Sequence, residues 1–293
     1  MDAIGGAIRV ASEMSPALGA RLTWMREWHR GDPALRVIRA LVRKGDTVVD
    51  IGANWGFFTA NLARLVGRAG HVHAIEPDPR QRESLEAISA RHGNVTLHAT
   101  GLSDREGEAI LHVPVMDGRP IGALASLTVP TGRAEIDHER VPVRLTRLDA
   151  LPIGGRVTFV KCDVEGHELA VLRGAGALLR RDRPAVLVEI EQRHQKEDIR
   201  QTFKHLAALD YAGYALRAQG PVPVEEFDVR RDQLDLLGSE FVSGAMPHGY
   251  VHDFVFVPAG SEALTSVISR IVIGRRGAKE RGQRQGQMSS LRV

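Results

Sequence analysis

Short apolar runs alternate with amphipathic stretches along most of the chain. Seven runs have the length and composition of buried strands, at Thr47–Val49, Gly70–Ile75, Asn94–His98, Arg156–Asp163, Ala185–Glu191, Tyr214–Arg217 and Val251–Val257. The stretches with helical character are Phe57–Val66, Asp78–His92, Glu168–Leu179 and Glu197–Leu209. Strands that alternate with helices predict an α/β fold, in which helices cover both faces of a mostly parallel sheet. In such a sheet the ligand lies beyond the carboxyl ends of the strands.

The remaining segments depart from this rhythm. Residues 1–44 are predicted to form an N-terminal helical cap, and residues 45–258 to form the main domain. Within that domain, residues 105–148 contain strand-like pieces without a helical period, which predicts a β insert near the ligand pocket. Residues 218–249 are rich in Asp, Pro and Gly and are expected to form a loop-rich cover. Residues 259–293 are predicted to be a basic, disordered tail, because beyond about residue 274 they lack apolar periodicity.

Two readings of the helical cap stay open. Asp32-Pro33 has the pattern of a helix start, an N-cap residue followed by proline in the first turn. The aromatic residues before it, Trp24 and Trp28, either pack the cap onto the sheet or line the active site.

Composition narrows the class of protein. The chain is 43% hydrophobic and 26% charged, which is ordinary for a globular protein, and no apolar run reaches the roughly 20 residues of a membrane span. Its single cysteine, Cys162, excludes an internal disulfide and fits the cytoplasm. The net charge of +3 comes from the tail, where seven Lys or Arg residues face two Glu. Since the body has no basic excess, DNA is not expected as a partner and RNA is disfavoured.

The most informative stretch is Asp50–Gly56, Asp-Ile-Gly-Ala-Asn-Trp-Gly, between the first strand and the first helix. Gly52 and Gly56 permit a tight turn and a close approach of the backbone to a ligand. The helix that follows directs its free N–H groups toward this turn. Asp50 ends the strand and is placed to receive a cationic group. The combination suggests S-adenosylmethionine (SAM), whose amino acid end carries both an ammonium and a carboxylate.

Further acids stand at the ends of the next strands. Glu76 follows the second strand, where a carboxylate can accept both hydroxyls of a ribose. Asp104 follows the third strand region and is placed to accept from the adenine amino group, while Ser103 offers a backbone N–H. Asp163 ends the fourth strand. A dinucleotide is the alternative cofactor, but its G-x-G-x-x-G fingerprint is poorly matched, since Asn54 and Phe57 stand where it needs glycines.

These motifs resemble the FkbM family of SAM-dependent methyltransferases. The resemblance covers about residues 45 to 195, and its most specific part is Lys161-Cys162-Asp163-Val164-Glu165-Gly166-His167-Glu168. It implies a Rossmann-like, seven-stranded domain that O-methylates hydroxyls of sugars or natural products. Carried onto this chain, it places the amino acid end of SAM at Asp50, Gly52, Asn54 and Gly56, the ribose at Glu76, the adenine at Ser103 and Asp104, and the methyl group at Asp163. We also expect Thr59 to bind the cofactor.

Methylation of a hydroxyl requires a general base, and three residues are candidates. They are Asp163, His194 and His167, because an imidazole titrates near neutral pH and a carboxylate stands beside the expected methyl group. Glu165 and Glu168 are expected to orient the substrate or to fix the start of the next helix. A divalent metal is left open, since Asp163, Glu165, Glu189 and Glu191 offer hard oxygen ligands whose spacing defines no site.

The sequence therefore predicts a cytoplasmic, SAM-dependent O-methyltransferase that acts on a small molecule of secondary metabolism. Three alternatives stay open: a carboxylate or amine acceptor, an oxidoreductase that binds an NAD-type nucleotide, and a non-catalytic SAM-binding protein. Homo-oligomerisation is also left open, and no membrane span is expected.

Overall fold

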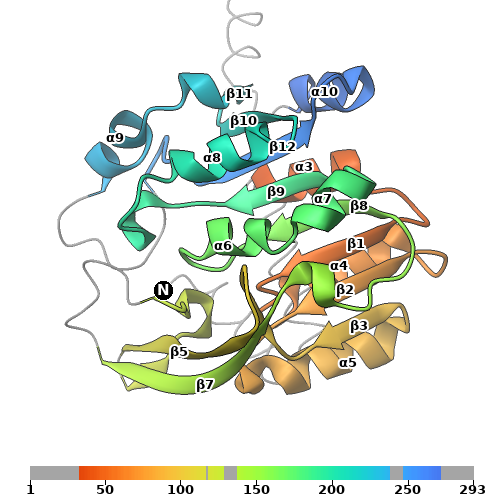
Figure 1. Cartoon of the computed structure of the whole chain (residues 1–293), viewed down its shortest axis with the longest axis vertical. Coiled ribbons are helices and arrows are strands. Elements are labelled where there is room, and N and C mark those ends of the chain that lie inside the picture. Colours follow the sequence, from red (N-terminus) through yellow and green to blue (C-terminus); the bar gives the residue numbers. More distant parts are fainter. Residues whose placement is uncertain (1–32, 117, 129–136, 238–246, 272–293) are drawn as a thin grey trace, which may run out of the picture.

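An eight-stranded sheet forms the centre of the structure, a computed structural model that describes residues 33–116, 118–128, 137–237 and 247–271 (Figure 1). Across the sheet its strands are β11 (Gly220–Pro223), β10 (Tyr211–Arg217), β12 (Asp253–Pro258), β9 (Ala185–Glu189), β8 (Val157–Cys162), β1 (Thr47–Ile51), β2 (His71–Ile75) and β3 (Val95–His98). From β9 to β3 all neighbours pair in parallel, whereas β12 is antiparallel to both β9 and β10. The predicted mostly parallel α/β sheet is confirmed.

The predicted number of strands was one too low. Each of the seven expected strands is present, and the eighth, β11, pairs antiparallel with β10 within the segment expected to be a loop-rich cover. Pro221 and Pro223 hid this strand from the sequence pattern. A proline is tolerated here because β11 lies at the edge of the sheet, where backbone N–H groups need no partner strand.

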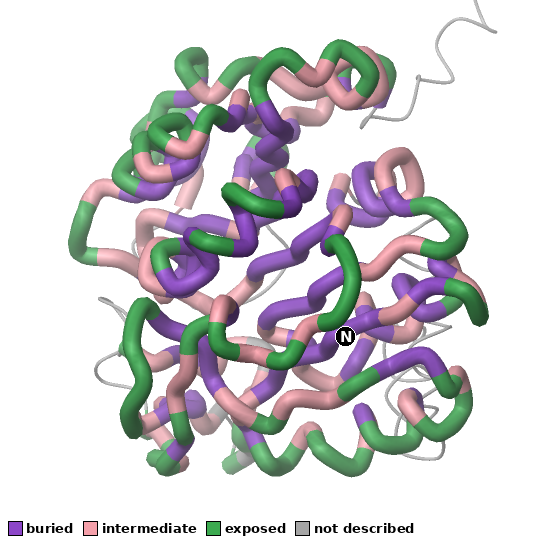
Figure 2. Tube along the Cα trace, turned by 45° about the vertical axis from the view of Figure 1, so that its right-hand side comes forward, coloured by how far each residue is buried: buried purple, intermediate pink, exposed green. Residues whose placement is uncertain are grey.

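The two faces of the sheet are apolar, because successive residues of each strand point to opposite sides. Val48 and Val72 pack on one side with α3 (Pro33–Leu41), α4 (Phe57–Val66), α5 (Arg82–His92) and α10 (Glu262–Ser269). Val49 and Ile75 pack on the other side with α6 (Glu168–Arg173), α7 (Gly176–Asp182) and α8 (Arg200–Ala207). Figure 2 shows the resulting pattern, with buried central strands beneath helices that are exposed on their outer sides.

Two expectations about helices need correction. The predicted helix Glu168–Leu179 is broken into α6 and α7, because Gly174 lies so close to the chain at Ser103 that a Cβ would come 2.0 Å from the Ser103 carbonyl oxygen. The segment expected to be a disordered tail begins with a helix, α10, which buries Ile268 against the sheet. Residues 1–32, with Trp24 and Trp28, and residues 272–293 lie outside the described residues.

The interval 105–148 contributes a second, smaller sheet. Its strands, in order, are β4 (Gly101–Leu102), β7 (His138–Thr146), β5 (Gly107–Met116) and β6 (Arg119–Pro120). The long hairpin of β5 and β7 has its own apolar cluster around Leu111 and Val113, and Figure 1 shows it below the large sheet. An ion pair of 2.6 Å between Arg80 and Glu139 connects it to the loop after β2.

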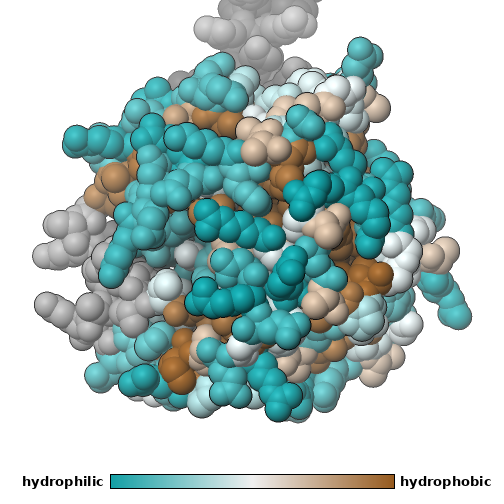
Figure 3. Space-filling model, in the orientation of Figure 1, coloured by the Kyte–Doolittle hydropathy of each residue, from teal (hydrophilic) through white to brown (hydrophobic). Residues whose placement is uncertain are grey.

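The connections include short helical segments. They are η1 (Pro79–Gln81), η2 (Gly122–Leu124), η3 (Leu148–Ala150), η4 (Gln192–His194), η5 (Val224–Glu226), α9 (Val229–Asp232) and η6 (Leu234–Leu236). The face in Figure 3 is mostly hydrophilic, with hydrophobic residues in small separate groups. Of the large hydrophobic residues in the described ranges, only Leu234 is exposed. None of the helices in these ranges is long and apolar enough to cross a membrane.

Candidate active site

A cavity with about 930 Å³ of empty space opens at the carboxyl ends of β1, β2 and β8. Residues from five parts of the chain line it. They are Ile51–Phe58 without Gly56, Ile75–Pro77, Thr100–Leu102, the insert residues Leu111, Gly122, Ala125 and Leu127, and the end of β8 with the stretch after it, Lys161, Asp163, Val164, Glu165 and His167. The position agrees with the rule for parallel sheets.

The loop after β1 is held in a tight, left-handed path. Gly52, Asn54 and Gly56 all have positive φ angles, of 74°, 48° and 94°. A Cβ at position 52 would lie 1.8 Å from the Asp163 carbonyl oxygen, so only glycine lets the loop touch the end of β8. Gly56 is the N-cap of α4 and does not itself line the cavity. The loop therefore lies close to the end of β8 and forms part of the cavity wall.

Glu76 lies in the cavity wall and is fixed by the backbone around it. Its Oε2 accepts the Asn54 N–H at 2.7 Å, and its Oε1 accepts the Asp78 N–H at 2.8 Å. Burial raises the pKa of Glu76 to about 7, although both N–H groups oppose that shift. Each carboxylate oxygen has a further lone pair with which to accept a ligand hydroxyl.

Asp50 does not face the cavity, which corrects the expectation that it contacts the ligand directly. Its side chain is fully buried; Oδ2 accepts the Thr59 hydroxyl at 2.6 Å, and Oδ1 lies 4.0 Å from Lys161 Nζ. Thr59 is equally buried, and its hydroxyl binds Asp50 rather than lining the cavity. Burial raises the pKa of Asp50, and the Lys161 cation opposes this shift. Asp50 and Thr59 thus lie behind the cavity wall and stabilise it without lining the cavity.

Lys161 is the cation of the cavity, and sequence reasoning assigned it no part beyond pairing with a carboxylate. Its ammonium lies 3.0 Å from Asp163 Oδ2 and 4.4 Å from the centre of the Phe58 ring. Although burial acts in the opposite direction, Asp163 and Asp50 raise the pKa of Lys161, so it stays charged. Asp163 is half-buried and lines the cavity as expected.

Ser103 and Asp104 are not placed for the expected contacts with adenine. The Ser103 N–H already donates to the Thr146 carbonyl at 2.9 Å, in the pairing of β4 with β7, and its side chain is buried behind the cavity wall. The Ser103 hydroxyl instead lies 2.9 Å from Nε2 of His167. Asp104 is exposed and does not line the cavity. Of this group only His167 reaches the cavity.

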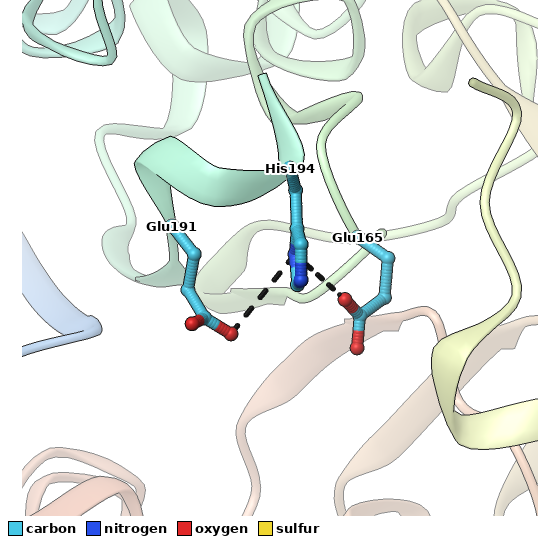
Figure 4. A group of neighbouring side chains, drawn as sticks. All are labelled: Glu165, Glu191 and His194. Atoms are coloured by element: carbon cyan, nitrogen blue, oxygen red, sulfur yellow. Dashed lines mark ion pairs between the residues drawn. The ribbon is translucent and has the colours of Figure 1, made fainter. Parts of the chain in front are cut away.

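Glu165 and His194 form an ion pair beside the cavity, with 2.8 Å between Oε2 and Nδ1 (Figure 4). Glu191 lies 4.0 Å from the same nitrogen, and these three residues are close enough to hold a metal ion. However, both oxygens of Glu191 already accept from Arg193, at 2.7 and 2.9 Å. Only Glu165 of the three lines the cavity.

Two further expectations in this region change. Glu168 is buried and does not line the cavity; it accepts the Gly166 N–H at 2.8 Å and the Gln195 amide at 2.8 Å, so it fixes the start of α6. Of the two anticipated roles, these contacts support the second, at the start of α6. Of the acids left open as metal ligands, Glu189 pairs with His252 at 3.0 Å, away from Glu165.

The predicted position of the insert near the pocket agrees with the cavity wall, although its individual lining residues were not anticipated. Ser126 ties the insert to the loop after β8, because its hydroxyl donates to the Glu165 carbonyl at 2.5 Å. Leu111, Ala125 and Leu127 then form an apolar wall opposite the sheet. The aromatic residues Trp55, Phe57 and Phe58 add a second apolar surface, and the aromatic run in the sequence was the signal that could have identified it.

Comparison with known proteins gives short matches to curated relatives. A 68-residue stretch is 41% identical to the protein-L-isoaspartate O-methyltransferase of Ignicoccus hospitalis, covering 22% of this chain and 31% of that protein. A 63-residue stretch is 41% identical to ribosomal RNA small subunit methyltransferase A of Rubrobacter xylanophilus, covering 22% and 23%. The chain thus matches less than a third of each relative's length.

Among solved structures, an FkbM methyltransferase from Methylobacillus flagellatus is similar over 86% of this chain and 58% of its own, with 15% identity and a TM-score of 0.45. A SAM-dependent O-methyltransferase from Thermotoga maritima is similar over 79% and 66%, with 15% identity and a TM-score of 0.40. The model of the methyltransferase FkbM domain matches residues 50–216, more than half of the chain. The chain therefore belongs to the FkbM methyltransferase family.

Proposed function

We propose that this protein is a SAM-dependent O-methyltransferase that methylates a hydroxyl of a small molecule such as a sugar or a natural product. Membership of the family supports the reaction class. The main observation in favour of this cofactor is the position of Glu76. Its carboxylate is held by two backbone N–H groups in the cavity wall. Bound SAM supplies a methyl group on a positively charged sulfur.

The residues fit this cofactor in an extended arrangement across three neighbouring strands. Glu76 follows β2 and would accept the ribose hydroxyls, and the Gly52–Asn54 backbone after β1 would hold the amino acid end. Asp163 follows β8, on the far side of β1 from β2, and this position supports a reacting end of the cofactor beside Asp163. Asp50, Thr59 and Gly56 would contribute by fixing the loop and the start of α4 rather than by direct contact.

The charges in the cavity favour a neutral hydroxyl over a carboxylate as the acceptor. Among the described lining residues, the acids are Glu76, Asp163 and Glu165, and the single Lys or Arg is Lys161. Since Asp163 already pairs with Lys161, an acceptor carboxylate would meet mainly negative charge. The apolar walls suit the carbon skeleton of such an acceptor.

His167 is the best placed of the three candidate bases. Oδ2 of Asp163 already accepts the Lys161 ammonium at 3.0 Å, so this oxygen is occupied. The side chain of His194 is only 3% exposed and lies between two glutamates, and it does not line the cavity. His167 lines the cavity, and burial lowers its pKa, so the imidazole is neutral at pH 7 and able to accept a proton.

Calorimetric titration with SAM, S-adenosylhomocysteine and NADH tests the cofactor. We expect the first two to bind to the wild type and NADH not to bind. Glu76→Ala should weaken SAM binding at least about ten-fold, because loss of hydrogen bonds to a charged group costs roughly 1.5–3 kcal/mol. The matched control Glu83→Ala, an exposed acid on α5, should bind like the wild type. Binding of NADH in place of SAM would show that the reaction class is wrong.

A further inference from the structure

Behind the cavity wall, three polar side chains form a chain of hydrogen bonds from His167 toward the surface. Nε2 of His167 lies 2.9 Å from the Ser103 hydroxyl oxygen, which in turn lies 3.3 Å from Oδ1 of Asp104. Ser103 is 2% exposed, whereas Asp104 is exposed and has Arg105 3.8 Å away. The chain thus leads from a residue of the cavity to a solvated carboxylate.

The direction of these hydrogen bonds follows from the chemistry of the carboxylate. An ionised carboxylate only accepts, so the Ser103 hydroxyl donates to Asp104. The Ser103 oxygen then accepts from His167, which requires the proton of the neutral imidazole to be on Nε2. Nδ1 is consequently left with its lone pair.

The middle member of this chain is held rigidly. The Ser103 N–H donates to the Thr146 carbonyl at 2.9 Å, and Gly174 packs directly against the Ser103 carbonyl, where a Cβ would come within 2.0 Å. His167 is the N-cap of α6, so its backbone is fixed by the helix that starts there. Such support is what a residue that orients an imidazole requires.

We propose that His167 is the general base of the methyl transfer and that Ser103 and Asp104 are positioning residues that fix its Nε2–H tautomer. This inference rests on the proposed function and extends it. The proton that leaves the acceptor hydroxyl is taken by Nδ1, which makes the ring an imidazolium. Asp104 stabilises that charge through the Ser103 hydroxyl without accepting the proton, and Nδ1 later releases the proton to water. The serine and aspartate assigned to adenine from the sequence thereby gain a different role.

The tautomer can be measured without a known acceptor, by NMR of the ¹⁵N-labelled full-length protein. We expect His167 in the wild type to show a protected Nε2–H proton and an unprotonated Nδ1. In Ser103→Ala that proton should exchange rapidly, and the pKa of His167 should fall because the link to Asp104 is lost. Asp104→Asn should also lower that pKa, since Arg105 would remain without the opposing carboxylate. Ser89→Ala, which removes a hydroxyl on α5, should leave His167 unchanged.

A second measurement, the effect of two cofactor analogues on the pKa of His167, tests whether this residue lies at the reacting centre. Sinefungin carries a cationic amine where SAM has its sulfur, and S-adenosylhomocysteine is neutral there. Sinefungin should therefore lower the pKa of His167 more than S-adenosylhomocysteine does. An Nδ1–H tautomer in the wild type, an unchanged His167 in a folded Ser103→Ala variant, or equal effects of two bound ligands would each overturn the inference. If neither ligand bound, the proposed function would fail, and the tautomer result would stand separately.

Discussion

At Glu76 the burial that fixes the carboxylate also raises its pKa to about 7, so this residue titrates at physiological pH. The ribose hydroxyls are donors, and only the ionised carboxylate has both oxygens free of protons to accept them. SAM affinity should therefore increase as pH rises through 7. Between pH 6 and pH 8 the ionised fraction changes about ten-fold, and so should the dissociation constant.

Calorimetry in buffers from pH 6 to pH 8 would measure this dependence, with Glu76→Gln as the comparison. The glutamine variant should bind weakly and show a much flatter pH profile. Equal pH dependence in both proteins would assign the titration to another group, such as Glu168, whose pKa burial also raises to about 7.

Single residues also show where sequence reasoning reached its limit. Glu76, Asp163 and the Gly52–Asn54 loop were found because a strand end followed by an acid or by glycines is a local pattern. The same pattern also predicted Asp50 and Ser103 as cofactor-binding residues. However, Asp50 is buried against Thr59 and Lys161, and the Ser103 N–H donates to the Thr146 carbonyl. Which way a side chain faces at a strand end depends on its neighbours in space, and these are not local in sequence.

At the scale of elements, the close contact between the β1 loop and the end of β8 determines the shape of the cavity. Gly52→Ala would place a Cβ 1.8 Å from a backbone oxygen at a φ of +74°. Because backbone cannot yield as a side chain does, we expect a loss of roughly 2–4 kcal/mol in the free energy of unfolding and loss of SAM binding.

Gly93→Ala is the matched control, because Gly93 also has a positive φ, of 69°, but open space around its Cα. It should cost only about 1 kcal/mol, the penalty of the left-handed conformation, and leave SAM binding intact. Chemical denaturation and calorimetry of both variants would check this. Similar losses for the two substitutions would mean that the contact with Asp163 adds nothing.

The elements themselves were more predictable than their junctions. All seven expected strands exist, because strands buried on both faces require apolar runs that can be recognised locally. The break between α6 and α7 and the edge strand β11 were missed, since the first depends on the contact of Gly174 with Ser103 and the second on pairing with β10. The insert residues of the cavity were missed for the same reason, because Ser126 meets Glu165 across a large sequence separation.

At the scale of the whole molecule, the sheet ends in a histidine cluster that links its stability to pH. His73 is 6% exposed on β2, and its Nδ1 lies 3.0 Å from Nε2 of His98 on β3; the His71 ring is 4.9 Å from that of His73. Burial, together with the charges that His71 and His98 acquire, lowers the pKa of His73 to about 4. In the unfolded chain the same imidazole titrates near its ordinary value of about 6.5.

Between pH 6.5 and pH 4 the unfolded chain therefore binds a proton that His73 in the folded chain does not. Unfolding is favoured as the pH falls through this window, and the stability lost should be on the order of 1–2 kcal/mol from this residue. Urea denaturation at pH 7 and pH 5 would measure the loss. His73→Phe keeps a ring against His98 and cannot titrate, so its loss should be smaller by most of that amount. His248→Phe, at an exposed position before β12, should retain the wild-type dependence. If both variants behaved alike, acid sensitivity would have to come from elsewhere in the molecule.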